Sequence, residues 1–95
     1  MNKLEEARLI INEADHELIE SFKKRMKAAK MIASYKKENN IPIYDEEREK
    51  ALINKNIILL DSEELEKYYL TFLDGILKAS KDYQKDLINK WNMLF

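Results

Sequence analysis

The sequence predicts an all-α protein of three helices, long, short and long, which pack as a helical bundle. Hydrophobic residues make up 45% of the 95 residues and recur with a period near 3.6, the period of an α-helix. The chain contains one Gly and one Pro, so little interrupts a helix, and no strand-like alternation is visible. Residues 1–95 fit a single domain. Such a short chain buries only about 60 to 65% of its unfolded surface, so a monomer would be marginally stable.

The first predicted helix covers about residues 3–39 and carries charge on its apolar face. We call this face the seam; steps of four and three residues place on it Leu4, Arg8, Ile11, Asp15, Leu18, Phe22, Arg25, Ala29, Ile32 and Lys36. Its apolar members mark it as the buried side, yet it also carries three cations, Arg8, Arg25 and Lys36, and only one acid, Asp15. A buried charge needs a partner, so this excess of cations calls for other helices or a bound anion. We favour the anion.

The first helix is also too long for the domain that contains it. At a rise of 1.5 Å per residue, Leu4 to Lys37 extends about 50 Å, whereas a compact domain of this size is about 30 to 35 Å across. No Gly or Pro lies between these residues to break the helix. The overhanging half is therefore expected to bury its seam against another copy of the chain, and a symmetric dimer is the simplest arrangement.

The second helix is predicted at about residues 46–60, after Asn39-Asn40 and Pro42 end the first. Asp45 is its expected N-cap, and acidic residues follow in the first turn, where the helix dipole favours negative charge. Arg48 stands there against that preference. A salt bridge to Asp45 or a neighbouring Glu and a contact with a ligand are equally open interpretations of Arg48.

The third helix is predicted at about residues 62–93, with Asp61 at the start of a capping box. Its expected buried face comprises Leu65, Tyr69, Phe72, Leu73, Ile76, Leu77, Leu87 and Trp91. Ser80 and Gln84 are polar residues one turn apart on this apolar face. They either bond within their own helix, as isolated pairs usually do, or face a ligand together with the cations of the first helix.

Composition argues against several classes of function. The chain has no cysteine, and its single histidine, His16, lies off the seam, so we predict no disulfide framework and no metal site. Seventeen basic and eighteen acidic residues give a net charge of −1, which argues against a nucleic-acid or anionic-membrane surface. No segment resembles a signal peptide or a membrane span, so a cytoplasmic protein is expected.

Arginine is used sparingly, which makes each arginine informative. The chain has fourteen lysines and three arginines, Arg8, Arg25 and Arg48, and two of these three lie on the seam. A guanidinium can hold a carboxylate or phosphate with two parallel donors, which an ammonium cannot do. Because the chain has almost no net charge, the predicted ligand is a small anion.

The polar residues of all three helices together resemble the pattern of the all-α (type II) chorismate mutases. In chain order they are Arg8, Arg25, Lys36, Asp45, Arg48, Glu49, Ser80 and Gln84. The most specific piece is K-K-E-N-N-I-P-I-Y-D-E-E-R-E, from Lys36 to Glu49. The resemblance extends from Leu4 to Gln84 and shows no departure at any polar position of the family's active site.

The resemblance implies an isomerase that rearranges chorismate to prephenate in aromatic amino-acid biosynthesis, the shikimate pathway. It also implies an intertwined homodimer with two sites that use no cofactor and no metal. A pericyclic rearrangement needs the substrate held in its compact reactive conformer. It also needs donors aimed at the ether oxygen, which gains negative charge as its bond to carbon breaks.

The resemblance gives catalytic roles to four residues. Arg25 and the partner subunit's Arg8 would hold the two carboxylates, while Lys36 and Gln84 would donate to the ether oxygen. Helix geometry agrees, because Lys36 returns to nearly the azimuth of Arg25 about 16 Å along the axis. Arg8 lies about 25 Å from Arg25 along the same helix, too far to meet the same small ligand, so it would serve the other site.

Four further substrate-binding residues follow from the resemblance. Asp45 and Glu49 would address the region of the ring hydroxyl, and Arg48 and Ser80 would complete the polar wall near a carboxylate. An isochorismate pyruvate lyase has a similar fold and cationic pocket, although the match from Lys36 to Glu49, together with Gln84, favours the mutase. A non-catalytic dimerisation module and a regulatory module that binds an aromatic acid are two further interpretations of this sequence. A free-standing enzyme and one domain of a bifunctional enzyme fit the sequence equally.

Overall fold

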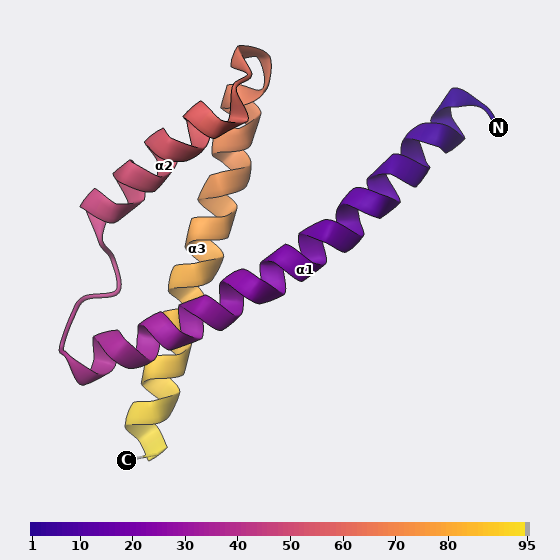
Figure 1. Cartoon of the computed structure of the whole chain (residues 1–95). Coiled ribbons are helices and arrows are strands. Elements are labelled where there is room, and N and C mark those ends of the chain that lie inside the picture. The colour runs from indigo at the N-terminus through magenta and orange to yellow at the C-terminus, as the bar shows by residue number, and fades with distance from the viewer. Residues whose placement is uncertain (95) are drawn as a thin grey trace.

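The computed structural model describes residues 1–94 as three α-helices joined by short connections (Figure 1). Helix α1 covers Lys3–Glu38, α2 covers Glu46–Leu60 and α3 covers Glu63–Leu94. None of the described residues is in a β-strand. The predicted all-α class and the long, short, long order of helices are therefore confirmed.

Helix α1 is one unbroken helix of 36 residues, as expected from its lack of Gly and Pro. It begins after Asn2, whose side-chain oxygen accepts a hydrogen bond from the backbone N–H of Glu5 at 2.9 Å. At the other end, the Asn39 side chain donates to the carbonyl of Tyr35 at 2.9 Å. Asn40 then turns the chain with a φ of 54°, a left-handed conformation that asparagine adopts more readily than most residues.

The caps of α2 and α3 only partly follow the sequence prediction. Asp45 is the N-cap of α2, as predicted, and accepts from the backbone N–H of Arg48 at 3.0 Å. The predicted capping box starting at Asp61 is wrong, because Asp61 has φ 47° and ψ 48° and ends α2 in the left-handed conformation. An N-cap requires extended backbone. Ser62 instead accepts from the N–H of Leu65 at 3.3 Å and caps α3.

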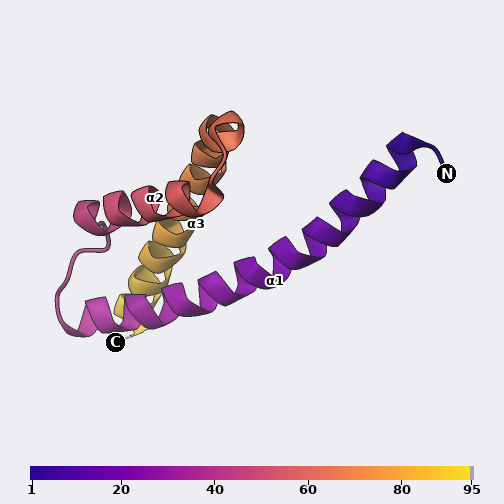
Figure 2. The same cartoon turned by 45° about the horizontal axis from the view of Figure 1, so that its top comes forward.

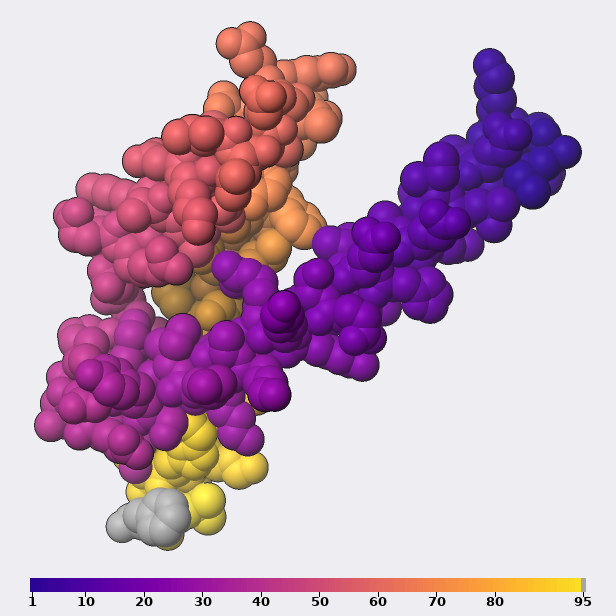
Figure 3. Space-filling model, viewed as in Figure 1, coloured from indigo at the N-terminus to yellow at the C-terminus, as the bar shows by residue number. Residues whose placement is uncertain are grey.

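Helix α3 packs against both α1 and α2, and the N-terminal half of α1 extends away from the other helices (Figures 1 and 2). This half forms an isolated arm in the space-filling view (Figure 3). The radius of gyration is 16.9 Å, against about 12 Å for a compact domain of this length. The expectation that the first helix overhangs its own domain is therefore confirmed.

The single chain buries very few side chains. Within residues 1–94, only Ala29, Ala33, Leu73 and Gln84 are buried. The apolar seam residues Leu4, Ile11, Leu18 and Ile32 are 45 to 58% exposed. On the projecting half of α1 the seam therefore has no neighbour within its own chain, whereas the seam member Ala29 is 2% exposed. Burial of the projecting half against a second copy stays a prediction. No helix in the described part of the chain is long and apolar enough to cross a membrane.

Candidate active site

A cavity of about 300 Å³ lies where the three helices meet, and seven of the eight predicted site residues line it. These seven are Arg25, Lys36, Asp45, Arg48, Glu49, Ser80 and Gln84. The rest of the lining is largely apolar and includes Ile32, Leu52 and Leu77. The space-filling view shows the hollow between α2 and the C-terminal half of α1, with α3 behind it (Figure 3).

Each helix contributes to the cavity through its own periodicity. Arg25 and Lys36 are eleven residues apart on α1, a spacing that places both on one face. Arg48 and Glu49 lie in the first turn of α2, where Asp45 fixes the backbone by capping it. On α3, Ser80 and Gln84 are four residues apart, about one helical turn, so both lie on the same face. Three segments distant in sequence therefore present their polar side chains to one space.

The ammonium of Lys36 is held in a defined position. Its Nζ donates to the backbone carbonyl of Ile43, in the loop between α1 and α2, at 2.7 Å, and the contact is partly buried. An ammonium has three hydrogens, so this bond leaves two donors for a ligand. The loop thus orients Lys36 without consuming its capacity to bind an anion.

Asp45 and Arg48 interact through the backbone rather than through an ion pair. The Asp45 carboxylate accepts the Arg48 N–H at 3.0 Å, and the described part of the chain contains no salt bridge between their side chains. Within residues 1–94, Arg48 forms a salt bridge neither with Asp45 nor with a neighbouring Glu. Arg48 instead lines the cavity.

Gln84 is a buried polar residue with unused hydrogen-bonding capacity. It is only 5% exposed, and its Nε2 donates to Oγ of Ser80 at 3.1 Å. Its Oε1 is buried and has no hydrogen-bond partner. Burying an unsatisfied polar atom typically costs about 1 to 3 kcal/mol, so this arrangement favours a ligand that bonds to the amide. The second Nε2 hydrogen is also available to a ligand.

Lys81 lines the same cavity, although it was not among the site residues predicted from the sequence. Its Nζ lies 3.1 Å from Oε2 of Glu49 and 4.8 Å from the centre of the Tyr44 ring. Lys81 follows Leu77 by four residues and precedes Gln84 by three, so helical spacing alone could have placed it on this face. It gave no signal of its own because lysine is the common surface cation of this chain.

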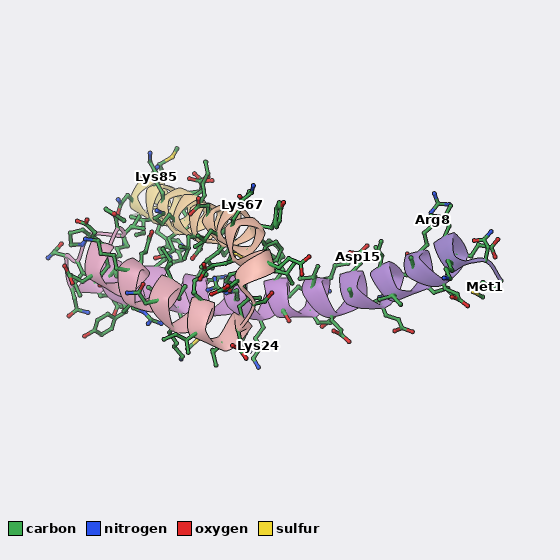
Figure 4. The ribbon with its side chains drawn as sticks, turned by 90° about the horizontal axis from the view of Figure 1, so that it is seen from above. Met1, Arg8, Asp15, Lys24, Lys67 and Lys85 are labelled. Atoms are coloured by element: carbon green, nitrogen blue, oxygen red, sulfur yellow. The ribbon has the colours of Figure 1, made fainter. Side chains whose placement is uncertain are left out.

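Arg8 is the one predicted site residue that does not line the cavity of its own chain. It lies near the end of the projecting half of α1, far from the other helices (Figure 4). Arg8 precedes Arg25 by seventeen residues on the same unbroken helix, which corresponds to about 25 Å. Within a single chain, Arg8 therefore cannot contact a ligand held by Arg25.

The cavity has an excess of positive charge. Its four cationic side chains, less its two carboxylates, leave a net charge of +2; the cations are Arg25, Lys36, Arg48 and Lys81, and the carboxylates are Asp45 and Glu49. Beside apolar walls, these interactions are stronger than in bulk solvent. Within residues 1–94, no three His, Cys, Asp or Glu side chains are grouped closely enough to hold a metal ion. The arrangement suits a small dianion with an apolar body.

A separate ion pair on α3 lies outside the cavity lining. Lys78 Nζ donates to Oδ2 of Asp82 at 2.6 Å, and this hydrogen bond raises the pKa of Lys78 and lowers the pKa of Asp82. Both side chains are exposed, by 76% and 58%. Exposed pairs of this kind contribute little to stability.

Comparison with known proteins points to one family. The family model described as chorismate mutase type II matches residues 7–85. A bifunctional chorismate mutase/prephenate dehydratase of Buchnera aphidicola subsp. Schizaphis graminum (strain Sg) is 38% identical over 91 residues, which cover 95% of this chain and 24% of the relative. Its counterpart from Buchnera aphidicola subsp. Baizongia pistaciae (strain Bp) is 38% identical over 93 residues, covering 97% and 25%. This chain thus spans about a quarter of the length of these relatives. No solved structure shows a significant match.

Proposed function

Since the chain belongs to the type II chorismate mutase family, we propose that it catalyses the rearrangement of chorismate to prephenate in aromatic amino-acid biosynthesis in the cytoplasm. The observation that carries this proposal is the convergence of seven polar residues from three helices on one cavity of about 300 Å³. The net charge of +2 on the lining complements the two carboxylates of chorismate.

The reaction sets limited chemical demands, and the cavity supplies groups of the required kind. One carbon–oxygen bond of the ether breaks while one carbon–carbon bond forms within the same molecule, and no proton is gained or lost. Catalysis therefore rests on holding a reactive conformer and on stabilising the charge that develops on the ether oxygen. Cations, an amide and apolar walls supply both without a nucleophile or a base.

Lys36 and Gln84 are the proposed donors to the ether oxygen. Lys36 is oriented by the carbonyl of Ile43 at 2.7 Å and Gln84 by Ser80 at 3.1 Å, and each retains at least one free N–H. Donors that are already fixed need little reorganisation as the transition state forms, which is why such groups contribute strongly to rate.

Four other residues would bind the rest of the substrate. Arg25 takes one carboxylate with its two parallel donors, and Arg48 lies in the polar wall beside a carboxylate. Asp45 and Glu49 would address the region of the ring hydroxyl, whose one hydrogen a carboxylate can accept.

We further propose that the active form is an intertwined homodimer in which the partner subunit's Arg8 completes each site. The exposed seam supports this, as does an apolar groove of about 370 Å³ lined by residues such as Leu18, Phe22 and Phe72. Arg25 borders both this groove and the cavity. If the partner's α1 lies in this groove, the partner's Arg8 can reach the second carboxylate of the substrate, the one that Arg25 does not bind.

The decisive experiment measures the loss of chorismate absorbance when purified protein is added, with prephenate identified as the product. The matched control is a double variant of two half-buried cations, Arg25→Leu with Lys36→Met, which should abolish turnover in the enzyme. A purely structural module would tolerate it, because apolar replacements of charges removed from water often preserve stability. Binding of chorismate without turnover would indicate a regulatory module instead. Pyruvate release from isochorismate, without prephenate from chorismate, would indicate a lyase.

A further inference from the structure

Lys81 and Glu49 form an ion pair that links α3 to the first turn of α2. The Lys81 ammonium lies 3.1 Å from Oε2 and 3.3 Å from Oε1 of Glu49, so it addresses both carboxylate oxygens. The two side chains are 34% and 21% exposed, which is less exposed than the surface pairs that contribute little. The contact joins residues 32 positions apart in the sequence.

The surroundings of Lys81 restrict its position further. Its Nζ lies 4.8 Å from the centre of the Tyr44 ring, within the range of a cation–π interaction. Tyr44 immediately precedes Asp45, the N-cap of α2. One lysine thus contacts a residue on each side of the α2 cap, and its contact with Glu49 joins two residues of the cavity lining.

The charge of the cavity depends on this pair. With Lys81 present, Glu49 is neutralised locally, and three cations remain against Asp45. Without Lys81, the net charge of the lining falls from +2 to +1, and Glu49 presents an uncompensated carboxylate to an incoming dianion. At close range in a partly buried site, such repulsion is much stronger than in water.

We propose that Lys81 is a positioning residue, which holds Glu49 toward the ring hydroxyl and cancels its charge so that the remaining cations bind the substrate carboxylates. This inference rests on the proposed chorismate mutase function. Lys81 acts through Glu49 and does not itself contact the reacting atoms.

The test is a double-mutant cycle of kcat and KM with Lys81→Met, Glu49→Gln and their combination. We expect Lys81→Met to lower kcat/KM about tenfold, the lower end of the range for losing a hydrogen bond to a charged group, because the pair is partly exposed. Most of this loss should appear as a higher KM, since repulsion acts on the bound substrate and the transition state alike. In the Glu49→Gln background, Lys81→Met should change kcat/KM by less than about twofold.

Three further variants separate positioning from charge and from folding. Lys78→Met removes one positive charge from the same helix, one turn before Lys81 and outside the cavity lining, and should leave kcat/KM unchanged within about twofold. Lys81→Arg keeps the charge and the donors and should restore most of the activity. Lys81→Gln serves as a second neutral variant if Lys81→Met fails to fold.

The outcomes are distinct. A loss from Lys81→Met that is equally large with and without Glu49 would overturn the inference, as would no loss at all. Equal losses from Lys78→Met and Lys81→Met would show a general charge effect and would also overturn it. An inactive wild-type protein would instead refute the proposed function, which the same assay reports separately.

Discussion

Two inactive variants, Arg8→Ala and Arg25→Ala, should recover activity when they share one dimer. The two arginines of one chain are seventeen residues apart on the unbroken α1, about 25 Å along its axis. The cavity that Arg25 lines does not include Arg8. If each site combines Arg25 of one chain with the partner's Arg8, every site in either variant homodimer lacks one arginine. Truncating one partner of a buried, hydrogen-bonded charge pair typically costs about 2 to 5 kcal/mol, so each homodimer should retain about 3% of the activity or less.

The expected recovery follows from two-fold symmetry. Refolding an equal mixture produces mixed dimers as half of the population, and each mixed dimer has one site with both arginines and one site with neither. One quarter of all sites are then intact, so about a quarter of wild-type activity should return. If Arg8 instead served the site of its own chain, every site in every dimer would still lack one arginine.

The assay unfolds the two variants, refolds them separately and together, and follows chorismate absorbance. Wild-type protein taken through the same cycle measures the yield of refolding, and a charge tag on one variant measures the fraction of mixed dimers. Mixed dimers that form without any recovery of activity would refute the shared site.

Three further predictions concern assembly, catalysis and stability. Light scattering at micromolar concentration should give twice the 11.4 kDa of the chain, because the single chain leaves its seam exposed; a folded 11.4 kDa species would contradict the intertwined dimer. Lys36→Ala and Gln84→Ala should each lower kcat about 10²- to 10³-fold with little change in KM, and a rise in KM alone would restrict these residues to binding. Leu73→Ala should lower the free energy of unfolding by about 2 to 5 kcal/mol, because Leu73 is 1% exposed. Urea titration at fixed protein concentration checks this, with Met93→Ala, 88% exposed, as the control that should change little.

The three helices were predictable from the sequence because their determinants are local. The 3.6-residue period and the absence of Gly and Pro between Leu4 and Lys37 predict a single long helix, and α1 is unbroken. Asp45 caps α2 as predicted, since capping depends on residues within one turn. The same reasoning failed at Asp61, where the left-handed backbone that ends α2 leaves the capping of α3 to Ser62.

The candidate site was only partly predictable. Polar residues on apolar faces identified Arg25, Lys36, Ser80 and Gln84, because a charge or amide on a buried stripe is unusual in any helix. Lys81 gave no such signal, since a lysine on a helix is ordinarily a surface residue. Lys81 differs from the surface lysines because it forms an ion pair with Glu49, 32 residues earlier in the sequence. Only the packing of α2 against α3 brings the two side chains within 3.1 Å.

The sequence by itself determined where each helix has its polar and apolar faces, because periodicity depends on residues a few positions apart. It also determined the length of α1, which is greater than its own domain can cover. Only the tertiary structure decided which faces meet: it placed seven polar residues around one cavity and left Arg8 outside it. It also left the seam of the projecting half of α1 exposed in the single chain. The physical reason is that burial and charge pairing depend on contacts between distant segments, which no local pattern specifies.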